Sequence, residues 1–110
     1  MAKHEFAILP WEPKGRYDEY DPWKYNFIKV DDELIEPLLP SFCGIKTFAH
    51  TLEEPWDGLN YCGITLIPPQ SIPAFQISLL QSEHLGRLQE LLALLKTAQS
   101  QNKFVIHYGI

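Results

Sequence analysis

The alternation of apolar and polar positions along the chain predicts five β-strands. We expect them at residues 4–9, 25–30, 44–50, 59–67 and 103–110. β-Branched side chains, which favour strands, are densest in the fourth of these segments. The last segment is apolar on both of its faces, and such strands belong in the interior of a sheet rather than at its edge. The C-terminus is therefore predicted to be part of the folded core.

Helical periodicity is clearest in the last third of the chain, where apolar residues recur at three- and four-residue spacing. These residues are Leu85, Leu88, Leu91, Leu92, Leu95 and Ala98. The spacing predicts one long amphipathic helix over 82–101, which Asn102 ends in a left-handed conformation. A short helix is predicted to begin at Asp31 or Asp32 and to end at Leu39, and Pro37 interrupts it. A second short helix is predicted over 71–81, for which a further strand is the alternative.

These elements together predict a single α+β domain over residues 1–110, with a mixed sheet of about five strands packed against the helices. Nine prolines argue against an all-helical bundle, because proline is excluded from helix interiors. A strand, a crossover helix and a second strand form the right-handed βαβ unit, in which the two strands are parallel. We therefore expect the strands at 61–67 and 104–108 to be parallel and joined by the helix over 82–101.

Charge and segment length exclude several classes of partner. The chain has 9 Lys and Arg against 14 Asp and Glu, a formal net charge of -5, and its basic residues are dispersed. Binding to a phosphate backbone or an anionic membrane surface requires clustered positive charge, so neither nucleic acid nor membrane is an expected partner. No apolar stretch approaches the ~20 residues that cross a bilayer, and none near the N-terminus is long enough for a secretory signal. We therefore expect a cytoplasmic protein.

The cysteines and glycines indicate no cofactor. Cys43 and Cys62 form no CxxC pair, so the usual signature of a zinc site or a redox pair is missing. We expect two reduced and mostly buried thiols, because free cysteine is among the most buried residue types. The six glycines are dispersed and form no phosphate-binding loop. No metal and no nucleotide cofactor is expected.

Histidines provide the main indication of an enzyme. His4, His50, His84 and His107 are scattered, and no pair has the spacing of a helical metal site. His50 and His107 lie at or near the ends of predicted strands, where they could meet in space. The enzyme alternative is therefore a His that acts with a Cys or a carboxylate, for example His50 with Cys43.

Acidic and aromatic residues are interleaved in the first third of the chain. Residues 1–36 contain nine acidic and five basic side chains, which contributes -4 to the total of -5. A solvated acidic face is the simplest interpretation of such a run. A protein-binding surface is the functional interpretation, and its candidate residues are Tyr17, Asp18, Glu19, Tyr20, Asp21, Trp23, Asp31, Asp32 and Glu33.

The composition of this segment favours a non-enzymatic protein-binding module. Tyr and Trp are enriched at the energetic centres of interfaces, and an acidic field speeds docking to a basic partner. The expected partner is therefore a basic protein. An immunity or inhibitor protein that masks a basic toxin enzyme is an alternative with the same physical profile. A homodimer that pairs an exposed sheet edge is another alternative.

Overall fold

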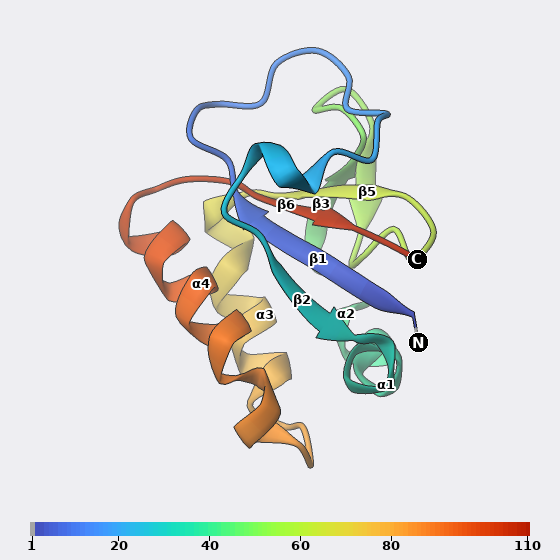
Figure 1. The fold of residues 1–110 in the computed structure, drawn as a ribbon, viewed down its shortest axis with the longest axis vertical. Coiled ribbons are helices and arrows are strands. Elements are labelled where there is room, and N and C mark those ends of the chain that lie inside the picture. Colours follow the sequence, from blue (N-terminus) through green and yellow to red (C-terminus); the bar gives the residue numbers. More distant parts are fainter. Residues whose placement is uncertain (1) are drawn as a thin grey trace.

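Two helices pack side by side on one face of a six-stranded antiparallel sheet in the computed structural model, which describes residues 2–110 (Figure 1). The strands are β1 (Lys3–Ile8), β2 (Ile28–Asp31), β3 (Lys46–Ala49), β4 (Pro55–Asp57), β5 (Ile64–Ile67) and β6 (Val105–Tyr108). Their order across the sheet is β2-β1-β6-β5-β3-β4. The α+β class is confirmed. The sixth strand is β4, which lies outside the five predicted strand segments.

The helices are short except for the last one. They are α1 (Asp32–Ile35), α2 (Leu39–Phe42), α3 (Ile72–Leu79) and α4 (Gln89–Ser100), with 3-10 turns η1 (Pro22–Lys24), η2 (Glu36–Leu38), η3 (Pro69–Ser71) and η4 (Leu85–Leu88). The helix predicted over 82–101 is thus a 3-10 turn followed by α4. Asn102, at φ 56, ends it as predicted. No helix within residues 2–110 is long and apolar enough to cross a membrane.

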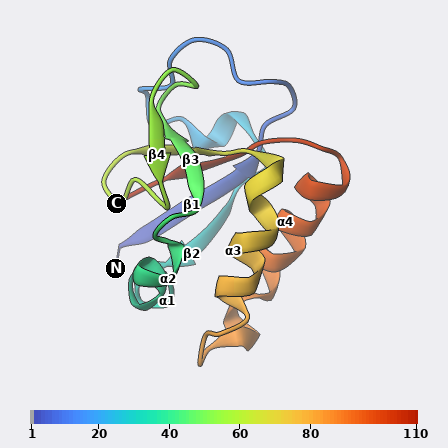
Figure 2. The same ribbon diagram turned by 180° about the vertical axis from the view of Figure 1, so that it is seen from behind.

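The sheet is antiparallel throughout, which corrects the prediction of a mixed sheet. β5 and β6 pair antiparallel, with Ile64 opposite Tyr108 and Ile67 opposite Val105. The prediction assumed that a single helix joins them. Instead α3 and α4 form a helical hairpin, seen from behind in Figure 2, and two helices return the chain to the end of the sheet at which β5 stopped. The next strand must then run in the opposite direction.

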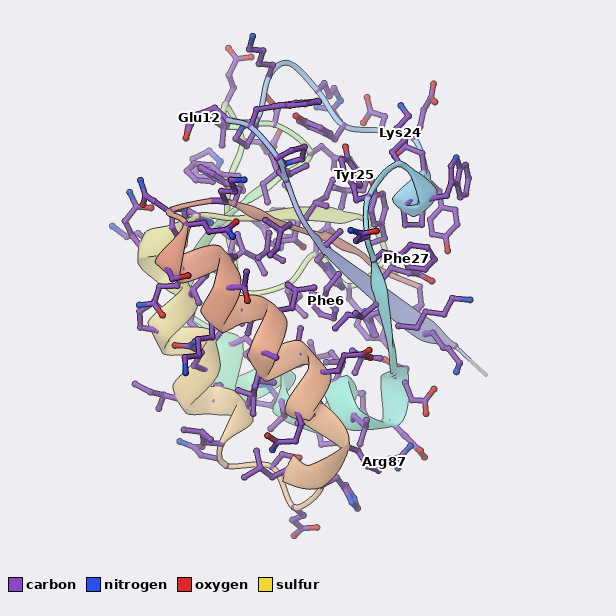
Figure 3. All side chains as sticks on the ribbon, turned by 60° about the vertical axis from the view of Figure 1, so that its left-hand side comes forward. Phe6, Glu12, Lys24, Tyr25, Phe27 and Arg87 are labelled. Atoms are coloured by element: carbon purple, nitrogen blue, oxygen red, sulfur yellow. The ribbon has the colours of Figure 1, made fainter. Side chains whose placement is uncertain are left out.

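Each face of the sheet has its own apolar core. The face toward the helices packs against α3, α4 and the α1–α2 segment, and Phe6 points from β1 toward α4 (Figure 3). Leu88, Leu91, Leu95 and Ala98 from the predicted stripe are buried in it, whereas Leu85 and Leu92 are half-buried. The second face is covered by the chain between β1 and β2, and its core contains Ala7, Leu9, Ile64, Leu66, Phe104, Ile106 and Tyr108. β6 is buried on both faces, as predicted.

Both cysteines are exposed, which corrects the expectation of buried thiols. Cys43 follows α2, at the point where the chain leaves the helix for β3. Cys62 lies in the turn before β5, because the strand predicted over 59–67 begins only at Ile64. The apolar sequence around Cys62 therefore belongs to a surface turn and not to the sheet interior.

We expect both thiols to react with a water-soluble thiol reagent in the folded protein. Exposed thiols need no unfolding step before reaction, so native and denatured samples should give the same count of two per chain. The count is measured by mass spectrometry after maleimide treatment, with Cys43→Ser and Cys62→Ser to identify each site. A thiol that reacts only in denaturant would contradict the structure.

Candidate functional site

The chain between β1 and β2 is held firmly against the second face of the sheet, and it contains six of the nine predicted binding residues. The Tyr108 hydroxyl donates a hydrogen bond to Asp21 Oδ1 at 2.8 Å, and Lys24 Nζ lies 2.9 Å from Asp21 Oδ2. The Tyr17 backbone N–H donates to the His50 carbonyl at 2.8 Å. These contacts connect the segment to β6 and to the β3–β4 hairpin, so its side chains have fixed positions although it is mostly irregular.

Two aromatic side chains on this segment are ordered and yet exposed. Tyr20 is 55% exposed and Trp23 is 67% exposed. Their ring centroids lie 5.8 Å apart in an edge-to-face arrangement, and Tyr20 makes a similar contact at 5.6 Å with the buried ring of Tyr108. Aromatic pairs of this geometry are favourable beyond the area they bury. The aromatic pair is therefore presented to solvent in a defined orientation.

The charges around the aromatic pair are partly neutralised within the segment. Arg16 Nε lies 2.8 Å from Asp18 Oδ2, and Lys24 pairs with Asp21. Glu19 forms no ion pair within residues 2–110. The hydrogen bond from Lys24 and that from Tyr108 lower the pKa of Asp21 despite its partial burial, which raises it. The surface is therefore acidic at particular positions and is not a uniform negative field.

The other three predicted residues lie at the far end of β2, where α1 begins, away from the helical turn of residues 22–24 (Figure 1). Arg87, labelled in Figure 3, places Nη2 3.0 Å from Asp31 Oδ2 and 2.9 Å from Glu33 Oε1. Asp32 accepts hydrogen bonds from a tyrosine and a histidine. These carboxylates thus have partners within the chain, and the structure separates them from the surface formed by residues 17–23.

A chain of buried polar side chains joins Asp32 to the middle of the sheet. Tyr61 donates its hydroxyl proton to Asp32 Oδ2 at 2.7 Å. His4 Nε2 lies 2.8 Å from Asp32 Oδ1, and His4 Nδ1 lies 2.8 Å from His107 Nε2. His107 Nδ1 lies 3.0 Å from the Thr65 hydroxyl. Both imidazoles are completely buried, so neither contacts solvent in the folded protein.

The partners at the two ends of the network fix the direction of one hydrogen bond. The Asp32 carboxylate only accepts, so His4 donates to it from Nε2. The Asn60 backbone N–H donates to Thr65 Oγ1, which leaves the Thr65 hydroxyl free either to donate to His107 Nδ1 or to accept from it. Burial keeps His107 neutral, so one of its ring nitrogens donates and the other accepts.

Burial and hydrogen bonding shift the titration of this network. Burial, with a smaller effect from the neighbouring His4, holds the pKa of His107 well below its ordinary value. The hydrogen bond from His4 lowers the pKa of Asp32. The hydrogen bond to Asp32 raises the pKa of Tyr61 to about 12. Sequence reasoning missed the pair of imidazoles because 103 positions separate the two histidines and only the pairing of β1 with β6 brings them together.

His50 and His107 do not meet in a shared pocket. His50 instead lines a small hollow of about 170 Å³ on the second face, together with Cys62, Asp18, Tyr20 and the C-terminal residues 108–109. Its Nδ1 lies 2.7 Å from the Tyr17 carbonyl and 3.3 Å from Asp18 Oδ1. The hollow therefore combines an imidazole, a carboxylate and an exposed thiol, and the thiol is Cys62 rather than Cys43.

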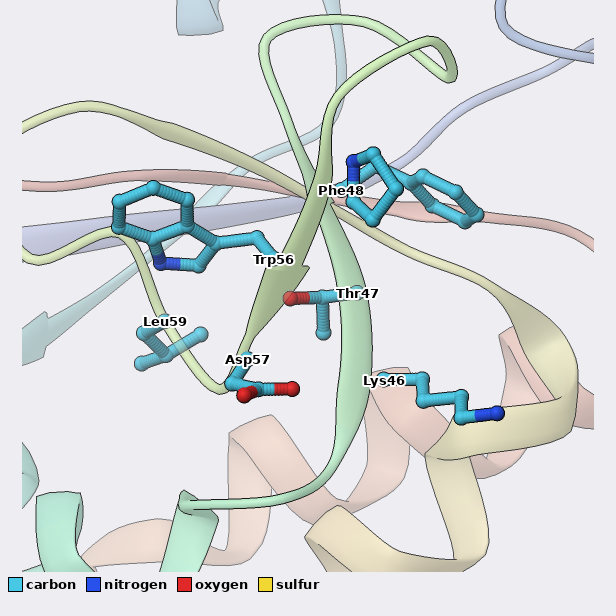
Figure 4. A pocket seen from close by; sticks show the side chains of 7 residues that line it. Lys46, Thr47, Phe48, Trp56, Asp57 and Leu59 are labelled. Atoms are coloured by element: carbon cyan, nitrogen blue, oxygen red, sulfur yellow. The ribbon is translucent and has the colours of Figure 1, made fainter.

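Another hollow lies on the β3–β4 hairpin at the edge of the sheet (Figure 4). It measures about 770 Å³, and its lining residues are Lys46, Thr47, Phe48, Pro55, Trp56, Asp57 and Leu59. The lining of this hollow is largely apolar. Within residues 2–110, no three His, Cys, Asp or Glu side chains converge in a way that could hold a metal ion.

Comparisons of this chain with protein-family models, curated proteins and solved structures gave no match.

Proposed function

We propose that this protein is a non-enzymatic protein-binding module that docks a basic partner through the surface of residues 17–23. One observation supports the proposal most strongly. Tyr20 and Trp23 expose a large part of their rings while edge-to-face contacts and the anchored Asp21 hold them in place. A preorganised aromatic pair loses little conformational freedom on binding, and Tyr and Trp dominate interface energetics.

Charge supports a basic partner over an acidic one. Asp18 and Glu19 flank the aromatic pair and are exposed, and the whole chain carries a formal net charge of -5. Such charges chiefly speed association and select the partner, whereas the buried aromatic contacts provide affinity. An immunity or inhibitor protein that covers a basic enzyme is one case of this function.

Trp23→Ala is expected to abolish capture of the physiological partner. Loss of an aromatic anchor at the centre of an interface typically costs about 2 kcal/mol or more, or roughly thirtyfold in affinity. The immobilised protein is used to capture basic proteins from the source cell, and each captured protein is then titrated against purified wild-type and variant chains. Trp56→Ala is the matched control, because Trp56 is also exposed but lies on β4 at the opposite edge of the sheet from β2.

Three results would count against the proposal. The first is equal affinity of the Trp23 and Trp56 variants for every captured protein. The second is binding that does not weaken with added salt, because exposed charges are screened at high ionic strength. The third is capture of acidic proteins alone.

A small enzyme remains the second candidate, because the hollow beside Cys62 holds His50 and Asp18. If His50 assists ionisation of the Cys62 thiol, His50→Gln should slow alkylation of Cys62 and leave that of Cys43 unchanged. Rates at the two thiols are compared within one sample by mass spectrometry. Equal slowing, or none, would leave this hollow without an activated nucleophile.

A further inference from the structure

Glu5 places a carboxylate near the middle of the sheet, directly beneath the proposed binding surface. Its side chain is only 5% exposed, and Oε1 is buried without a hydrogen-bond partner within residues 2–110. Buried carboxylates are ordinarily paired with a cation or fully hydrogen-bonded, because leaving one unpaired is costly. Glu5 therefore retains a capacity for binding that the folded chain does not use.

Within residues 2–110, no cation forms an ion pair with Glu5. Lys29 is its cross-strand neighbour on β2, but the ammonium group lies 6.0 Å from the centroid of the Phe27 ring and forms no ion pair with Glu5. Lys3, two residues earlier on β1, pairs with Asp31 at 3.2 Å. On the other side, Tyr108 of β6 is opposite Glu5 in the register.

The remaining groups near Glu5 are aromatic or acidic. Tyr108 gives its hydroxyl proton to Asp21 and so does not satisfy Glu5. Burial raises the pKa of Tyr20, as do its hydrogen bond to Glu5 and the charge of Glu5, so the Tyr20 hydroxyl is one partner of the carboxylate. The ring of Tyr20 contacts both Trp23 and Tyr108 edge-to-face. The carboxylate thus lies next to a cluster of aromatic rings, and its Oε1 has no hydrogen-bond partner within residues 2–110.

We propose that Glu5, Tyr20 and Trp23 form a subsite for an arginine side chain of the basic partner. This inference rests on the proposed function and specifies the chemistry that the surface recognises. A guanidinium group is planar and weakly hydrated, stacks on aromatic rings, and donates hydrogen bonds to a carboxylate in a fixed geometry. An ammonium group shares the charge, but it stacks less well and is more strongly hydrated.

Binding at this subsite requires a modest local movement. Because the Tyr20 hydroxyl hydrogen-bonds to Glu5, the Tyr20 side chain must turn aside to admit the guanidinium, and Trp23 is then the part of the aromatic pair that keeps its orientation. The Tyr20 ring is 55% exposed, so no buried core has to open for this rotation. The guanidinium then lies against Trp23 and donates to Oε1 of Glu5, which gives this oxygen a charge-assisted hydrogen bond.

The test uses small probes, so it does not depend on the partner's identity. We expect Nα-acetyl-arginine amide to produce saturable shifts of the Trp23 indole N–H signal in NMR spectra, with Trp11 and Trp56 as internal references. Nα-acetyl-citrulline amide has nearly the same shape without the charge and should produce none. Nα-acetyl-lysine amide should bind more weakly than the arginine probe. Equal shifts with arginine and citrulline, or shifts confined to Trp11 or Trp56, would overturn the proposal.

Glu5→Gln is the decisive variant, because it keeps the shape of the side chain and removes the charge. We expect it to weaken binding of the arginine probe by about tenfold or more, the typical effect of losing a charge-assisted hydrogen bond. Glu90→Gln removes an exposed carboxylate from α4, on the other face of the sheet, and should leave binding unchanged. Tyr20→Phe keeps the ring but removes the hydroxyl that contacts Glu5, so binding should be retained or tightened. Wild-type affinity in the Glu5 variant would refute the subsite.

Two measurements keep these outcomes interpretable. Thermal unfolding should show that Glu5→Gln is as stable as the wild type or more so, because an unpaired buried charge has been removed. If that variant does not fold, Trp23→Leu, at an exposed position, provides the same test and should also lose probe binding. Trp23-dependent capture without arginine binding would refute only the subsite. Glu5-dependent arginine binding without any captured partner would instead support the subsite and count against the proposed function.

Discussion

Leu88→Asp is expected to unfold the protein at room temperature. Leu88 is completely buried in the core between the helices and the sheet, together with Leu91 and Leu95. The substitution removes the apolar contacts of a leucine and forces a carboxylate into a site without a partner, at a combined cost of about 5 kcal/mol or more. Small domains have free energies of unfolding of about 5–15 kcal/mol. Circular dichroism and urea titration would measure the loss.

Two neighbouring substitutions provide the controls. Leu92→Asp changes a half-buried position of the same helix and should lower the free energy of unfolding by less. Leu80→Asp changes a residue that is 58% exposed and should have almost no effect. A Leu88 variant that keeps the cooperative melt of the wild type would show that α4 does not pack on the sheet in this way.

The free energy of unfolding is expected to fall as the pH is lowered below about 6.5, which is well above the pH at which most carboxylates titrate. His107 is neutral in the folded protein because burial holds its pKa far below the ordinary value of 6.5. In the unfolded chain it binds a proton below about pH 6.5, so the unfolded state holds more protons there. Its contribution to stability is therefore fully present above that pH and is lost as the pH falls, by about 1.4 kcal/mol per pH unit. The lowered pKa of Asp32 acts in the same direction below its ordinary value of 3.8.

His107→Gln should reduce the slope of the free energy of unfolding against pH, because the variant takes up about one proton fewer on unfolding in acid. Glutamine can still donate to His4 Nδ1 from its amide but does not titrate. The measurement is the free energy of unfolding in urea at several values between about pH 5 and pH 8. His84→Gln changes an exposed histidine and should leave the pH profile as it is in the wild type. An unchanged slope in the His107 variant would contradict the assignment of a buried, neutral imidazole.

Elements with a strong local signal were predicted well. The segments predicted as strands at 4–9 and 103–110 form β1 and β6, which pair in the sheet. The leucine spacing located α4, and four of the six residues of the predicted stripe are buried. Periodicity reports which residues share a face, and that information is local. The start of α4 was predicted too early, because the turn after α3 contains apolar residues that resemble a helical stripe.

Strand direction and strand edges were predicted poorly. Parallel pairing followed from counting one crossover helix, whereas the helical hairpin of α3 and α4 reverses the direction of β6. β4 has only three exposed residues, including a proline and a tryptophan, and its only support is pairing with β3. Cys62 was placed in a strand because its neighbours are apolar. In each case, the outcome depends on which distant segment supplies the hydrogen bonds.

The structure divides the predicted site residues into two groups. Residues 17–23 lie together on one surface, because they are consecutive and anchored by Asp21 and Tyr108. Asp31, Asp32 and Glu33 were grouped with them by proximity in sequence, but β2 extends the chain between the two groups. Glu5 was not predicted as a site residue, since nothing in an isolated strand shows that its cross-strand neighbours leave a carboxylate without a partner.

The sequence by itself determined the class of fold, the buried face of the principal helix and the two-sided burial of the last strand, because these follow from the periodicity of side chains along neighbouring positions. Only the tertiary structure decided the strand directions, the pairing of His4 with His107 and the absence of an ion pair to Glu5 within residues 2–110. Each of these depends on contacts between segments far apart in the chain, where the geometry of closure and the competition among hydrogen-bond partners determine which groups are satisfied.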